Sequence, residues 1–137
     1  MPGEFQMKKR MAWNILGLMA LSLPANAHHS FSMFDAAQEK TLQGTVKEFQ
    51  WTNPHAWVQL MVTGPDGKIT EWSIECASLN SLKREGWRGT AIKTGDKVSV
   101  VIHPLKNGEP GGSLVIVTLP DGKQLGRRGP PPKEGAQ

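Results

Sequence analysis

Apolar and polar residues alternate with period two along much of the chain after residue 40. Five stretches show this pattern, at residues 41–51, 56–62, 69–75, 97–103 and 113–119. A period of two is typical of a β-strand with one buried face, so these stretches predict five strands. The first stretch changes phase near Glu48 and Phe49, which predicts a β-bulge beside Gly44 or Glu48.

A single short helix is predicted between the third and fourth strands. Ser78 is a typical N-cap, Leu79 and Leu82 lie three residues apart, and Gly86 is a typical helix stop. Three strands, a helix and two strands are the element order of the OB-fold, a small Greek-key barrel. We therefore predict an all-β, five-stranded OB-like barrel over residues 41–125; a small open sandwich is the alternative.

The first 27 residues have the pattern of a cleaved signal peptide. Three basic residues at 8–10 precede an uncharged apolar run at 11–23, and residues 25–27 read Ala-Asn-Ala. The run is shorter than the ~20 residues that span a bilayer. We expect cleavage after Ala27, a periplasmic or secreted protein that begins at His28 and is not held in a membrane, an N-terminal arm at 28–40 and a disordered tail at 126–137.

Composition then narrows the classes of partner. Removal of residues 1–27 takes away three basic residues and one acidic residue, which leaves thirteen basic against eleven acidic residues. No basic stripe follows the chain, so nucleic acid is not an expected partner. Cys76 is the only cysteine; we expect a small buried side chain there and a fold held by its core, without a disulfide.

Four histidines survive the predicted cleavage, namely His28, His29, His55 and His103. Taken singly, each has an ordinary structural explanation. The first and fourth interstrand loops of an OB-fold lie at one end of the barrel, which predicts that His55 and His103 lie close together. Imidazole binds copper, zinc and nickel, and the amine of an N-terminal histidine could join its own ring in holding copper. Copper is therefore the expected cofactor, if any is bound.

Tryptophan offers a second kind of site. Trp51, Asn53 and Trp57 flank the loop that contains His55 and could bind a small ligand or a protein partner, whereas Trp72 and Trp87 are expected in the core. No motif for a nucleophile or a phosphate is present, and we expect the carboxylates of Glu71 and Glu75 to face solvent.

Two functions remain open from these residues. The first is an exported module that binds a copper-type metal ion. The alternative is a non-metal binding or accessory protein that uses exposed tryptophan. An oxidative enzyme with a copper histidine brace is less favoured, because such sites belong to larger sandwich folds. We therefore expect a binding protein and not an enzyme.

Several segments resemble one family of small exported bacterial proteins that is known only as a domain of unknown function. They are "HHSFSMFD", "GTVKEFQWTNPHAWVQL", "EWSIE", "LKREGW" and "GDKVSVVIHPLKNG". The resemblance covers about residues 28–125, and its most specific parts are the His-His-Ser start and the Trp-x-Asn-Pro-His motif. It implies a periplasmic β-barrel-like domain with no established activity. It also implies a functional group formed by His28, His29, Asn53, Pro54 and His55.

Overall fold

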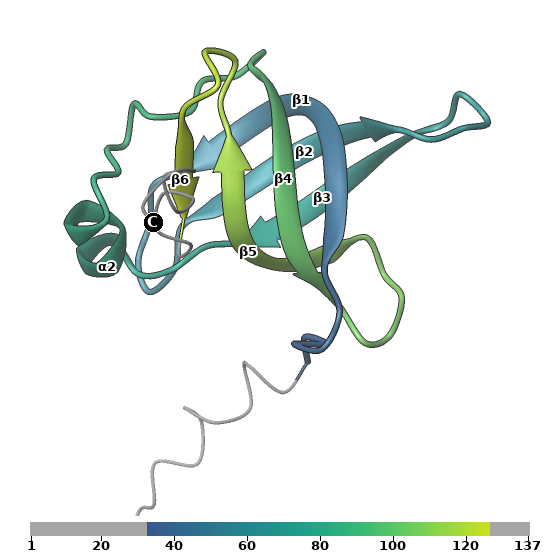
Figure 1. The fold of residues 1–137 in the computed structure, drawn as a ribbon, viewed down its shortest axis with the longest axis horizontal. Helices are drawn as coiled ribbons and strands as arrows, with labels where there is room; N and C mark the ends of the chain where they lie inside the picture. The colour runs from purple at the N-terminus through teal and green to yellow at the C-terminus, as the bar shows by residue number, and fades with distance from the viewer. Residues whose placement is uncertain (1–32, 127–137) are drawn as a thin grey trace, which may run out of the picture.

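A computed structural model describes residues 33–126, which form one β-barrel with a short helix beside it (Figure 1). The elements follow the predicted order. They are β1 (Lys40–Gln50), β2 (Trp57–Thr63), β3 (Ile69–Glu75), α2 (Leu79–Arg84), β4 (Lys97–Pro104), β5 (Gly111–Thr118) and β6 (Gln124–Gly126).

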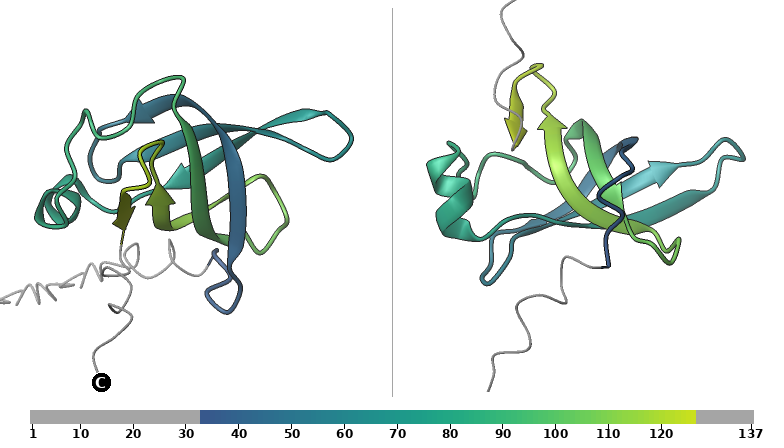
Figure 2. Two further views of the ribbon diagram at one scale, coloured as in Figure 1. Left: turned by 45° about the horizontal axis from the view of Figure 1, so that its top comes forward. Right: turned by 60° about the horizontal axis from the view of Figure 1, so that its bottom comes forward.

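The sheet closes on itself. Its hydrogen-bonded order is β3-β2-β1-β4-β5-β6, and an additional parallel pairing joins β3 to β5. This pairing makes a closed barrel of β1 to β5, which the views in Figure 2 show from two further sides. The OB-like topology predicted from the sequence is therefore confirmed.

The short strand β6 was not predicted. It pairs antiparallel with β5, and Val117 lies opposite Leu125. Gly126 ends this strand although the sequence suggested that the tail begins there. The predicted signal peptide, and the rest of the predicted tail, lie outside the described residues.

Strand β1 belongs to both halves of the barrel because it bends and carries a bulge. Its first half pairs with β4 and its second half with β2. The pairing with β2 shifts between Val46 and Glu48, so the predicted bulge is confirmed. The extra residue there is Lys47, and it reverses which faces of the strand point inward.

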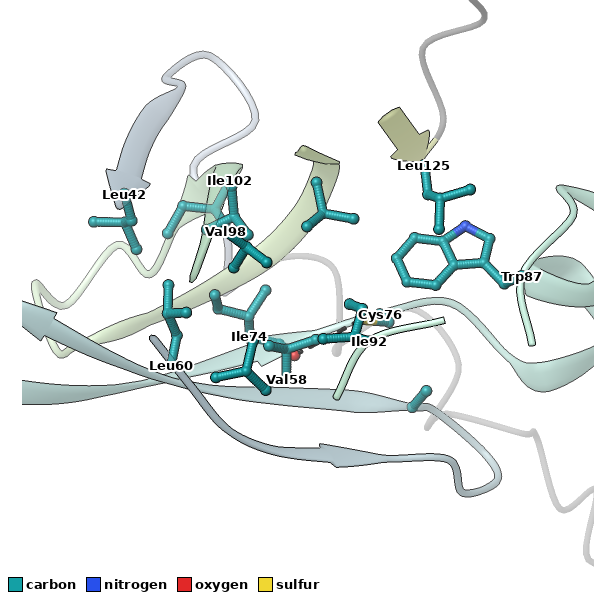
Figure 3. Packing of buried hydrophobic residues seen from close by; sticks show 14 of the residues in the cluster. Leu42, Val58, Leu60, Ile74, Cys76, Trp87, Ile92, Val98, Ile102 and Leu125 are labelled. Atoms are coloured by element: carbon teal, nitrogen blue, oxygen red, sulfur yellow. Dashed lines mark hydrogen bonds between the residues drawn. The ribbon is translucent and has the colours of Figure 1, made fainter. Parts of the chain in front are cut away.

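The interior is filled by one cluster of aliphatic side chains. Figure 3 shows Val58, Leu60 and Ile74 from β2 and β3 facing Val98 and Ile102 from β4. The cluster continues outward from the barrel to the segment around α2, where the following residues are buried: Leu82, Trp87 and Ile92.

The two tryptophans expected in the core differ. Trp87 is 2% exposed, as predicted. Trp72 is only half-buried, packs against the edge of the cluster and has the Lys40 ammonium 4.7 Å from its ring centroid. Within residues 33–126 no helix has the length and apolar character needed to cross a membrane.

Candidate metal and ligand site

A row of four side chains crosses the outer surface of the barrel where β3 meets β5. Trp57 lies opposite Glu75, Glu75 opposite Ser113, and Ser113 opposite His103. Residues opposite each other in adjacent strands share a face of the sheet. Ile74, next to Glu75, is fully buried in the core, so the row faces outward.

The row is partly covered by the described end of the N-terminal arm. Phe34 forms an isolated β-bridge with Leu105, and the Lys106 N–H donates to the Met33 carbonyl over 2.9 Å. Phe34 is only 6% exposed. The arm therefore runs along the end of β4 and over the seam of the barrel, as a fixed part of the fold.

A cavity of about 410 Å³ lies between this arm, the loop before β2, the end of β3 and α2. Both described histidines, His55 and His103, line it together with Glu75. The structure thus brings to one cavity two residues that are 48 positions apart in sequence.

His55 is held by a buried carboxylate. Its Nδ1 contacts Oε1 of Glu75, and the side chains of the two residues are 29% and 10% exposed. Thr52 fixes the loop, because its hydroxyl donates to the His55 carbonyl over 2.9 Å. A carboxylate can only accept, so Nδ1 carries the proton in this contact and Nε2 of a neutral ring keeps its lone pair.

His103 is held in the same way by the backbone. Its Nδ1 lies 2.8 Å from the carbonyl oxygen of Gln38 in the arm, so Nδ1–H donates and Nε2 again keeps its lone pair. Histidines that bind metals through one ring nitrogen usually donate the other N–H to a carboxylate or a carbonyl. Both rings in this cavity therefore have the hydrogen bonds typical of metal ligands.

The described residues do not by themselves form a metal site. Within residues 33–126 no group of three or more histidine, cysteine or acidic side chains could hold a metal ion. His28 and His29, the other two predicted ligands, lie outside the described residues.

Cys76 also lines the cavity but is a poor ligand. Burial, and to a lesser extent the charge of Glu75, raise the pKa of its thiol to about 12. The thiol therefore stays neutral, whereas metals bind the thiolate. Its burial, 5% exposed, agrees with the structural role predicted from the sequence.

The predicted ligand-binding tryptophans lie apart from the histidine cavity. Trp51 lines a separate hollow beside Gly89 and contacts Phe49 edge to face, with 5.6 Å between ring centroids. Trp57 lines a further hollow at the other side of Glu75. Asn53 is exposed and precedes the cis peptide bond to Pro54.

The exposure of Glu75 was predicted wrongly from the sequence. We expected Glu71 and Glu75 to face solvent together. Glu71 is exposed and pairs with Lys47, but Glu75 is 9% exposed. Both belong to the outer face of β3, and only Glu75 is covered by the arm and the His55 loop. Alternation along one strand carries no information about such a cover.

Comparison with known proteins identifies the family of the chain but not its activity. No curated protein matches the sequence. A solved structure similar to this one is the mitochondrial single-stranded DNA binding protein Rim1 of S. cerevisiae, with 12% sequence identity, a TM-score of 0.45, and coverage of 61% of this chain and 94% of that chain. Residues 16–114, well over half of the chain, match a family of unknown function, DUF6152, and the protein belongs to this family.

Proposed function

We propose that this protein is an exported module that binds a copper-type metal ion in the cavity of His55 and His103. The observation that carries the proposal is that both imidazole rings make the same kind of hydrogen bond. Each donates from Nδ1 to a fixed oxygen, of Glu75 or of Gln38, and each leaves Nε2 available. Imidazole suits copper, zinc and nickel, and copper has the highest affinity for such nitrogen ligands among the divalent ions of the first row.

The predicted N-terminus would complete the set of ligands. His29 precedes Met33 by four residues, Met33 is hydrogen-bonded to Lys106, and the next residue, Phe34, lines the cavity. Four residues of extended chain span at most ~14 Å. We infer that this length lets His29 return to the cavity. If processing leaves His28 first, its amine and ring, with His29, would add nitrogen ligands to those of His55 and His103.

Titration of the exported, processed protein with copper(II) tests this proposal. Intact mass should first show a chain that begins at His28. Calorimetry at neutral pH should then show one bound ion, and His55→Ala and His103→Ala should each weaken binding at least tenfold. Because protons compete for imidazole, affinity should fall as pH drops below ~6.5.

Ser99→Ala is a matched control for His103→Ala, because both residues belong to β4. Ser99 lies on the same outward face of β4 as His103 but four residues away, and it does not line the cavity. It should bind copper like the unchanged protein. A wild-type protein that gives no heat and does not compete with a weak chelator would refute the metal function. The same holds if both histidine variants bind copper as tightly as the wild type.

A further inference from the structure

A second hollow adjoins the histidine cavity and is chemically different from it. It has a volume of about 620 Å³, and its lining includes Met33 and Phe34 of the arm, Trp57 of β2 and the loop between β4 and β5. This volume lies within the range of small-molecule sites. Glu75 lines both the cavity and the second hollow.

Glu75 provides a largely buried negative charge, and one of its oxygens has no partner in the part of the chain that the structure describes. Its Oε1 contacts His55, but among residues 33–126 no hydrogen bond reaches Oε2. The side chain is only 10% exposed. Among residues 33–126, Trp87 Nε1 is the one fully enclosed side-chain N or O atom without a partner, so Oε2 of Glu75 remains accessible from the hollow. A ligand that donates a hydrogen bond or carries positive charge can replace water at this oxygen.

The remaining lining favours an organic cation over a metal ion. The lining includes the aromatic side chains of Trp57 and Phe34, and Glu109 adds a second carboxylate. Aromatic faces attract ammonium groups. Hard metal ions need six or more oxygen ligands, whereas most of this lining is apolar. An alkyl chain that ends in an ammonium group satisfies both the carboxylates and the apolar wall.

We propose that the second hollow binds a primary alkylammonium ion, such as a short diamine, with its charge at Glu75 and its alkyl chain against Trp57. This site goes beyond the proposed copper function and does not depend on it. Lys106 allows a test of whether the ligand is positively or negatively charged, because it is the basic side chain in the lining. Its charge opposes a cation, so Lys106→Gln should tighten binding.

The experiment is calorimetric titration of the processed protein with 1,4-diaminobutane, with EDTA present and at low salt. The neutral analogue 1,4-butanediol is titrated in parallel. We expect the diamine to bind and the diol not to bind. Glu75→Gln and Trp57→Leu should each weaken diamine binding at least fivefold, and Lys106→Gln should strengthen it about two- to fivefold.

Glu71→Gln is the matched control, since Glu71 lies on the same strand and face but is exposed and does not line the hollow. His103→Ala separates this proposal from the copper site, because His103 lines only the histidine cavity; it should retain diamine binding. Absence of diamine binding, equal binding of the diol, or weaker binding by Lys106→Gln would overturn the proposal. The Lys106 and Trp57 variants decide it even if Glu75→Gln fails to fold.

Discussion

Cys76 shows how burial sets the chemistry of a single residue. Its sulfur is enclosed near the Ile74 carbonyl, 3.9 Å away, and the charge of Glu75 lies close by. Both effects favour the neutral thiol and raise its pKa from 9.0 to about 12. Because the folded value exceeds the unfolded one, this preference stabilises the fold below pH 9 and is lost as pH rises towards 12.

We expect Cys76 to react slowly with iodoacetamide at pH 8 in the folded protein. The thiolate is the reactive form, and both its small population and its burial oppose attack. In urea the thiol becomes accessible and regains an ordinary pKa, so labelling should be faster by at least a hundredfold. Mass spectrometry over time measures both rates. Rapid labelling of the folded protein would contradict the enclosed environment described here.

Single residues also mark the limit of inference from sequence. The histidines stand out by their rarity and by the loops they occupy, so His55 and His103 could be named in advance. Glu75 could not, because its burial depends on chain segments that are distant in sequence. The arm residue Gln38 acts through its backbone carbonyl, which no residue type reveals.

Among the elements, β1 depends most on one position. Gly44 lies where β1 passes close to β2, and a Cβ built there would be 2.5 Å from the Met61 carbonyl oxygen and 2.9 Å from Leu60 Cγ. Neither partner can yield easily, since one is backbone and the other belongs to a core side chain. A larger side chain therefore has to displace β2 or bend β1 further.

Gly44→Ala should lower the free energy of unfolding by about 1–3 kcal/mol, the usual cost of overpacking. Urea denaturation followed by circular dichroism measures this. Gln43→Ala is the control, because Gln43 is its exposed neighbour in the same strand and should change stability by less than ~0.5 kcal/mol. Equal stability of the two variants would show that the close approach at Gly44 is relieved without cost.

Element by element, prediction succeeded where the pattern was long enough. The five strands of the barrel are each at least seven residues long, and α2 has both an N-cap and a glycine stop. The three residues of β6 are too few to show a period. Leu125 alone carries its apolar signal, and it becomes buried only because β5 lies beside it.

At the scale of the whole molecule, closure of the barrel creates both proposed sites. The short parallel pairing from Ser73 to Glu75 brings β3 beside β5, and it places Glu75 in one row with His103. This pairing joins segments nearly forty residues apart, and the sequence predicted it only through the element order of the fold. The arm then covers part of this seam, and of the four residues in the row only Glu75 is buried.

The core that supports this seam extends from the barrel interior to Trp87. This indole lies 6.1 Å from the Phe49 ring, between centroids, and also lines the histidine cavity. Trp72, by contrast, packs at the edge of the cluster and remains half-buried. Removal of a large side chain costs most where the surroundings cannot collapse or admit water.

Trp87→Ala should therefore lower the free energy of unfolding by about 3–5 kcal/mol, and Trp72→Ala by clearly less. The sequence pattern predicted that Trp72 and Trp87 are both core residues, whereas the structure buries only Trp87. A smaller loss of stability in Trp72→Ala than in Trp87→Ala would therefore support the structure over the sequence pattern. Urea denaturation with circular dichroism measures both. If Trp72→Ala proved the more costly change, the segment after α2 would be only loosely attached to the barrel. Trp87 would then form a wall of the histidine cavity that is not rigid enough to hold a metal site.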